Sequence, residues 1–206
     1  MADETPPPDA STRWIETSRG ILRLSELAPL LAERVLRVQE HIETGGYAEQ
    51  PLDEHLIRSL HGDFCGDLVP EWAGRWRVIA VRVGTHEPPA PHLVPELMRN
   101  YLLDLEARLT EPLPVEQLPE ALAFAEGRLL SIHPFTDFNG RLVRLWLWEV
   151  LRRTSLPPVN LVPSTSDEVP AYLSALRAAD RMDFRPLEAL WRQRLAEAGN
   201  RDEAAQ

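Results

Sequence analysis

The most informative part of this sequence is a polar stretch at residues 133–144, His-Pro-Phe-Thr-Asp-Phe-Asn-Gly-Arg-Leu-Val-Arg. It places a histidine, a carboxylate, an amide, a glycine and two arginines within twelve positions. Apolar runs precede it at residues 129–132 and follow it at residues 142–148, and residues of that kind are normally buried. The polar side chains are therefore held between two parts of one core, which indicates a rigid functional site.

The spacing of apolar residues predicts a mainly helical chain with one β excursion. We expect helices at residues 21–42, 51–60, 93–109, 115–132, 139–153, 168–179 and 185–196. Residues 72–83 are rich in β-branched side chains and are bounded by Gly74 and Gly84, which predicts a small hairpin or an extended flap. The 206 residues suffice for one sizeable core. We expect a disordered arm at residues 1–13, a helical segment at 14–50, the main domain at 51–198 and a frayed end at 199–206.

Composition narrows the class of partner. The net charge of −10 argues against a general nucleic-acid or anionic-membrane surface. The single cysteine, Cys65, cannot form an internal disulfide, which is typical of a cytoplasmic protein. No apolar run approaches the roughly 20 residues that a membrane span needs. The N-terminus has neither a basic start nor an apolar core, so we expect no signal peptide and a cytoplasmic location.

The second half of the polar stretch has the residues of an anion site. Asn139 is a good helix cap, and Gly140 lets a backbone curl round a phosphate oxygen. A helix N-terminus attracts anions through its free N–H groups and its dipole. Arg141 and Arg144 lie three residues apart, so both project from one face of the first turns and suit a polyphosphate.

The first half has the residues of phosphoryl chemistry. Asp137 beside phosphates would hold Mg²⁺, which takes one or two carboxylates together with phosphate oxygens. His133 has a side chain that titrates near neutrality, so it can accept a proton from an attacking hydroxyl. Each residue alone also has an ordinary explanation, as a structural histidine, a solvated arginine face or a turn. Their order and spacing favour phosphoryl or nucleotidyl transfer.

The stretch resembles the signature of the Fic family, His-Pro-Phe-x-Asp/Glu-Gly-Asn-Gly-Arg-x-x-Arg, at every defined position except 138. The resemblance extends over residues 52–190. It includes Leu60 and His61, residues 72–77 before the flap, residues 94–98 after it, and residues 156–158 and 172–180 downstream. It implies a Fic-type helical bundle with a small β-hairpin flap.

The resemblance also implies an activity, adenylylation (AMPylation), in which AMP moves from Mg-ATP to a Ser, Thr or Tyr hydroxyl of a target protein. His133 would be the general base, Phe135 would anchor the loop, and Asp137 would ligate Mg²⁺. The nucleotide phosphates would meet Phe138, Asn139, Gly140, Arg141 and Arg144. A flap including Arg77, Val83, Gly84, Thr85 and His86 would dock the target as an added strand, and Tyr172 and Asp180 fall near the adenine pocket.

Phe138 stands where the family has glycine. If this position needs a positive φ, phenylalanine costs about 1–2 kcal/mol. The ring would either point away from the phosphates or occupy their space. Three functions stay open: AMP transfer, a second kind of transfer (of phosphate from ATP as in the related Doc branch, or from another phosphorylated donor), and a nucleotide- or target-binding module without catalysis.

Many members of the family carry an inhibitory helix with the pattern Ser/Thr-x-x-x-Glu-Gly/Asn. The nearest stretch here is residues 39–44, which departs from the pattern at its first and last defined positions. Glu43 is the candidate inhibitory glutamate and would act by pairing with Arg144. A surface position for Glu43, and inhibition by a partner protein or by self-association, are the alternatives.

Overall fold

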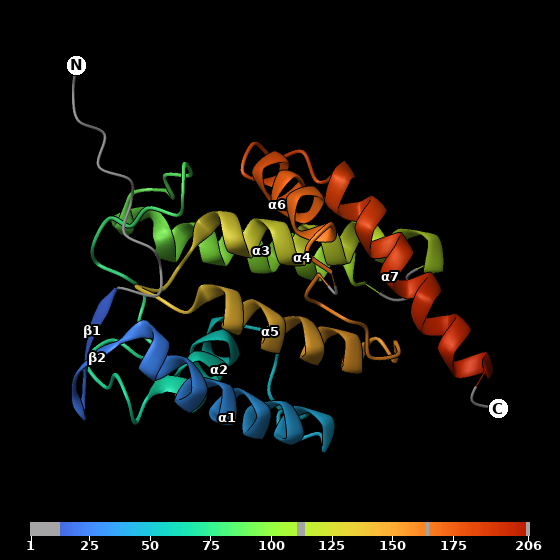
Figure 1. Cartoon of the computed structure of the whole chain (residues 1–206). Helices are drawn as coiled ribbons and strands as arrows, with labels where there is room; N and C mark the ends of the chain where they lie inside the picture. Colours follow the sequence, from blue (N-terminus) through green and yellow to red (C-terminus); the bar gives the residue numbers. More distant parts are fainter. Residues whose placement is uncertain (1–12, 111–113, 164, 205–206) are drawn as a thin grey trace.

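The structure is a computed structural model that describes residues 13–110, 114–163 and 165–204. In this part of the chain, seven α-helices, two short 3₁₀ helices and one antiparallel hairpin are present (Figure 1). The elements in order are β1 (Trp14–Thr17), β2 (Gly20–Arg23), α1 (Leu24–Glu43), α2 (Glu54–Cys65), η2 (Pro91–Leu93), α3 (Val94–Arg108), η3 (Val115–Gln117), α4 (Leu118–Ile132), α5 (Asn139–Arg153), α6 (Glu168–Ala179) and α7 (Arg185–Ala204).

Helix α4 is the central element of the bundle. It is buried around most of its circumference, as expected for a helix that is apolar on several faces. Helices α3, α5, α6 and α7 all pack against it, while α1 packs on α2 and α5 on the other side (Figure 1). The polar stretch of the sequence is the connection from α4 to α5, so its two ends are held by the core.

A buried hydrogen-bond chain ties the three helices α3, α4 and α5 together. The indole N–H of Trp146 donates to the Tyr101 hydroxyl at 2.8 Å, and this hydroxyl donates to the Ala125 carbonyl at 3.0 Å. Both large side chains can be fully buried because their polar atoms are satisfied. Helix α5 therefore keeps a fixed position relative to the end of α4.

The hairpin β1–β2 was not predicted, because the expected helix at residues 21–42 included most of its second strand. Trp14 pairs with Arg23 and Thr17 with Gly20. The hairpin is fixed to the region after α2 by two hydrogen bonds from Ser18, whose N–H donates to the Leu68 carbonyl at 2.8 Å and whose hydroxyl donates to the Asp67 carbonyl at 2.6 Å.

Of the two predictions for residues 72–83, the small hairpin is wrong and the extended flap agrees with the structure. The mainly helical fold with one small hairpin is confirmed, with the hairpin at β1–β2. In the described residues this region has no regular strand, only an isolated bridge between Val83 and His86. Its β-branched residues have no partner strand, and Val78 and Ile79 are 87% and 53% exposed. We call residues 77–89 the flap; it is an extended loop.

The helix predictions are confirmed with small shifts at most boundaries. The largest difference is at the end of the chain, where α7 continues to Ala204 rather than ending near residue 196. The described residues begin at Arg13, so the predicted arm at residues 1–13 lies almost entirely outside them. The last two residues of the predicted frayed end, 205 and 206, also lie outside them. None of the described helices combines the length and the hydropathy that crossing a bilayer requires.

Candidate active site

His133 ends helix α4 in a left-handed conformation, with φ of 50°. Its Nδ1 lies 3.3 Å from the Leu130 carbonyl, and a carbonyl only accepts, so Nδ1 carries the proton. Nε2 is then the unprotonated nitrogen. Burial lowers the pKa of His133 from its usual 6.5 to about 4, with smaller contributions from the nearby Arg77 and His86. The imidazole is therefore neutral at physiological pH and able to accept a proton.

Arg77 holds the flap against the His133 backbone. Its Nε donates to the His133 carbonyl at 2.7 Å, and one terminal nitrogen donates to Pro89 at 2.6 Å and Ile132 at 3.3 Å. Its other terminal nitrogen donates to Ile79 at 3.1 Å. Arg77 is only 2% exposed, so the expectation that it contacts a docked target is wrong. A guanidinium group suits this place because it has five donors in one plane.

Asn139 fixes the turn of the loop instead of pointing into open space. Its Oδ1 accepts from the Phe135 N–H at 3.0 Å, and its Nδ2 donates to the Phe135 carbonyl at 2.9 Å. The residue is 1% exposed, and both ends of its amide are engaged. Its side chain therefore supports the loop, which differs from the phosphate-binding role expected for it.

His61 of α2 supports the same loop and was not identified as a site residue from the sequence. Its ring stacks on Phe135 at 3.8 Å between centroids, with Phe135 fully buried as expected. Nδ1 accepts from the Gly74 N–H at 3.0 Å, so Nε2 carries the proton and donates to the Asp137 carbonyl at 3.1 Å. Burial lowers the pKa of His61 to about 3, which keeps the ring neutral. The sequence did offer one signal for His61: it lies in a segment before the flap that resembles the Fic family.

Phe138 has the positive φ that its place in the motif predicts, 61°. Its ring is 4% exposed and packs with Trp72 at 5.3 Å and Phe64 at 6.4 Å between centroids. Of the two expected outcomes, the structure has the one in which the ring turns into the core. Its carbonyl still begins helix α5, by accepting from the N–H groups of Arg141 at 3.0 Å and Leu142 at 3.1 Å.

Gly140 is exposed in the first turn of α5. A Cβ built on it would meet nothing within 4 Å, and its φ is not positive. The backbone conformation therefore does not require glycine here, contrary to the expected curl of the chain. What glycine provides is free space above the helix N-terminus, where an anion can approach the N–H groups.

Arg141 and Arg144 are the cations of the site. In the described part of the chain neither guanidinium group has a hydrogen-bond or ion-pair partner, and burial lowers the pKa of both. The Arg141 guanidinium lies 5.7 Å from the centre of the Phe138 ring, within cation–π range. Half-buried arginines without acceptors are costly unless a ligand supplies the acceptors, so this pair suits an anionic substrate.

Asp137 has both carboxylate oxygens engaged. Oδ1 accepts from the Phe138 N–H at 2.7 Å, and Oδ2 forms an ion pair with Arg13. No group of three His, Cys, Asp or Glu side chains that could hold a metal ion exists among the described residues. A lone carboxylate fits Mg²⁺ that takes its remaining ligands from phosphates and water, provided that Arg13 releases Oδ2.

The two residues expected near an adenine pocket have different neighbours. Tyr172 donates to Glu126 at 2.6 Å and lines a cavity of about 270 Å³ between α6, α7 and the segment before α6, and it is close enough to Arg144 of the motif to interact with it electrostatically. Asp180 lies 3.4 Å from Nδ1 of His86 in the flap, and burial raises the pKa of this carboxyl. Nε2 of His86 donates to the Ser131 carbonyl at 2.9 Å. The structure therefore does not bring Tyr172 and Asp180 together.

The flap residues expected to meet a target are accessible at the tip. Val83 is 44% exposed, and Gly84 and Thr85 are also exposed. The structure does not test whether these residues dock a target, so their docking role stays a prediction.

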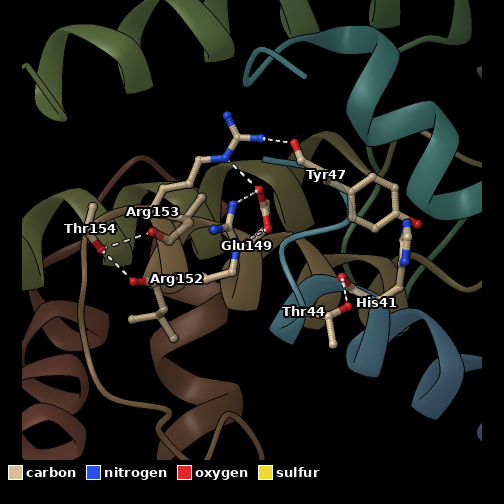
Figure 2. A network of polar contacts seen from close by, with 9 residues as sticks. His41, Thr44, Tyr47, Glu149, Arg152, Arg153 and Thr154 are labelled. Carbon is tan, nitrogen blue, oxygen red and sulfur yellow. Dashed lines mark hydrogen bonds and ion pairs between the residues drawn. The ribbon is translucent and has the colours of Figure 1, made fainter. Parts of the chain in front are cut away.

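Glu43 is not positioned to inhibit. Its carboxylate is exposed and accepts from Gln39 at 2.9 Å, at the C-terminal end of α1. That end lies beside the C-terminal end of α5, where Arg153 donates to the Tyr47 carbonyl at 2.9 Å and pairs with Glu149 (Figure 2). Arg144 lies nine residues earlier on α5, about 13 Å along the helix axis. Glu43 is therefore a surface acid in this structure.

Comparisons with known proteins agree with the motif and the fold. Residues 51–151 match the family model described as Fic/DOC family. Protein adenylyltransferase fic-1 of Caenorhabditis elegans is 36% identical over 133 residues, which are 63% of this chain and 24% of that protein. A solved structure of C. elegans Fic-1 has a TM-score of 0.63 and 26% identity, covering 86% of this chain and 50% of that chain.

A second solved structure shares the fold at lower sequence similarity. BepC of Bartonella tribocorum with bound AMPPNP has a TM-score of 0.70 at 16% identity and covers 89% of this chain and 92% of that chain. The chain spans only about a quarter of the length of the curated relatives that it matches. On the motif, the helical fold and these matches, the chain contains a Fic/DOC family domain, matched over residues 51–151.

Proposed function

We propose that this chain transfers AMP from Mg-ATP to a hydroxyl side chain of a target protein. The observation that carries the proposal is the pairing of a neutral His133 with two unpartnered arginines across one short, rigid loop. Arg141 and Arg144 begin the helix that follows the loop, and His133 ends the helix that precedes it. A base and a polyphosphate site are thereby held in one piece of backbone.

The residues suggest a simple sequence of events. Nε2 of His133 accepts the proton of the target hydroxyl while its oxygen attacks the α-phosphorus. The bond to the β-phosphate oxygen breaks, and pyrophosphate leaves with its charge next to Arg141 and Arg144. Mg²⁺ at Asp137 would neutralise part of the phosphate charge. The exposed flap tip at Val83, Gly84 and Thr85 would align an extended target segment by β-strand addition, through main-chain groups outside the Val83–His86 bridge.

Two observations favour this reading over its alternatives. The relatives at 33–36% identity are named protein adenylyltransferases, which supports AMP as the transferred group. The Phe138 ring lies in the core, so it does not fill the space above Gly140 that the phosphates would need. This weakens the reading in which Phe138 turns the chain into a binding module without catalysis.

The test is mass spectrometry of the chain and of a cell lysate after incubation with Mg-ATP. Addition of AMP that disappears in His133→Ala supports the proposal. His92→Ala is the matched control, because His92 is exposed in η2 and has no place in the loop. Addition of phosphate would identify a kinase of the Doc type. No His133-dependent mass shift on any protein would contradict transferase activity.

A further inference from the structure

The side chain of Arg13 occupies the one carboxylate that the proposed reaction assigns to a metal ion. The guanidinium group pairs with Oδ2 of Asp137, from a position 124 residues earlier in the chain. The other oxygen of Asp137 accepts from the Phe138 N–H at 2.7 Å. Oδ2 is therefore the oxygen that a cation would use, and Arg13 already holds it.

Arg13 is delivered by a folded element rather than by a loose chain end. Its carbonyl accepts from the N–H of Leu24 at 2.8 Å, directly before strand β1 and at the start of α1. The hairpin is fixed at its turn by Ser18 and at its base by Ile15, which is 8% exposed. The backbone of Arg13 is thus held near the loop before any ligand binds, which reduces the entropy cost of the ion pair.

A guanidinium group and a divalent cation cannot share this oxygen. Mg²⁺ binds oxygen at about 2.0–2.1 Å in a strict octahedral shell, which leaves no room for a hydrogen bond from Arg13 along the same direction. The Arg13 side chain is 50% exposed, and that of Asp137 is 22% exposed. Such a pair is weak enough to open. Arg13 can therefore move into solvent, so the two cations compete and neither blocks the other permanently.

We propose that Arg13 is an affinity-determining residue of the site, which lowers the affinity for the divalent cation by competing for Asp137. This inference rests on the proposed function, because that function assigns the cation to Asp137. It adds a role for the hairpin β1–β2, which lies outside the matched residues 51–151.

The test measures cation binding directly, without turnover. Mn²⁺ replaces Mg²⁺, the non-hydrolysable AMPPNP is present at saturation, and free Mn²⁺ is followed by electron paramagnetic resonance. Arg13→Ala is expected to bind Mn²⁺ about three- to tenfold more tightly than the unchanged chain. Arg19→Ala is the matched control, because it removes the same charge from the turn of the same hairpin without touching Asp137. We expect it to keep the original affinity.

Two more variants complete the design. Asp137→Asn should weaken Mn²⁺ binding, and adding Arg13→Ala to it should have no further effect. Arg13→Lys keeps the charge and should give an intermediate affinity, so it tests the idea even if the alanine variant folds poorly. Equal affinity, or weaker binding, in Arg13→Ala and Arg13→Lys while AMPPNP still binds would overturn this inference alone. Absence of AMPPNP binding in every variant would overturn the proposed function as well.

Discussion

Phe138 holds a left-handed backbone conformation with a large, β-carbon-bearing side chain, which is normally unfavourable. The strain of about 1–2 kcal/mol is smaller than the gain from burying a phenylalanine ring against Trp72 and Phe64. The free energy gained by burying the ring therefore exceeds the cost of the strained backbone at Phe138. The same ring lies under the Arg141 guanidinium, so the residue that departs from the family motif also contacts a residue that matches it.

Replacing Phe138 by glycine is expected to destabilise the protein. Loss of the buried ring costs about 3–5 kcal/mol, and relief of the positive φ returns about 1 kcal/mol. Phe138→Ala loses the ring but keeps the strain, so it should be about 1 kcal/mol less stable than Phe138→Gly. Urea unfolding measures both differences. An alanine variant as stable as the glycine variant would show that the left-handed conformation stores no strain.

His133 should remain a neutral base over the physiological range. Its pKa of about 4 means that the proton binds only in acid, so the rate of transfer should be flat from about pH 6 to 8 with respect to this group. The rate should fall below about pH 5 as the imidazole becomes protonated. Titration of its ring signals by nuclear magnetic resonance gives the same quantity without activity. A midpoint near 6.5 would contradict the buried environment.

At the scale of elements, the flap and the α4–α5 loop are one unit because Arg77 joins them. Its N–H and side chain reach carbonyls on both sides of the His133 position, and its own burial leaves little freedom. A flap without regular strands is thereby given a fixed base. Its tip, closed by the bridge between Val83 and His86, is supported through the His86 side chain, which donates to the Ser131 carbonyl of α4 and lies beside Asp180.

The variant Arg77→Lys should loosen the flap. A lysine has one ammonium group and cannot reach all four carbonyls, so several buried acceptors lose their donors. The amides of Val83 and His86, which bond each other's carbonyls at 3.0 and 2.9 Å, should exchange with solvent at least about tenfold faster. Arg75→Lys, on the exposed side of the same segment, is the control. Unchanged exchange in Arg77→Lys would show that the flap is held elsewhere.

The elements differ in how far the sequence predicts them. Helices α5 and α6 have the predicted bounds, because apolar periodicity marks both helices and the motif also marks the start of α5. The hairpin β1–β2 has four-residue strands, too short for alternation to stand out, and its position depends on contacts with Leu68 and Asp67. The flap has strand-like composition, but composition does not supply a partner strand.

The site shows the same division. The positive φ at Phe138 could be predicted, because the motif has glycine there. The engagement of Asn139 by Phe135 could not, since it depends on how the loop turns. The contact between Arg13 and Asp137 joins distant parts of the chain, so no local sequence pattern could predict it.

At the scale of the whole molecule, two neutral histidines make the fold sensitive to acid. The pKa of His61 is about 3 and that of His133 about 4, both below the usual 6.5 because of burial. Between these values and 6.5 the unfolded chain binds protons that the folded chain does not. Stability from these groups is therefore complete above about pH 6.5 and decreases as the pH falls.

The contribution of His61 can be isolated. Because of His61 alone, the free energy of unfolding should be about 2 kcal/mol lower at pH 5 than at pH 7. His61→Gln has no proton to gain while it keeps one donor and one acceptor, so its loss between the two pH values should be smaller by about this amount. Urea unfolding at pH 7 and pH 5 gives the comparison. An equal loss in both proteins would show that His61 is not the acid-sensitive group.

The turn of Phe138 into the core has a consequence for protein engineering. The motif at residues 133–144 is matched to Phe64 and Trp72, which belong to a different part of the chain. A chimera that receives only these twelve residues would present a phenylalanine to a recipient core with no place prepared for it. Transplanting this loop between scaffolds therefore requires moving the aromatic neighbours together with it, as a single module.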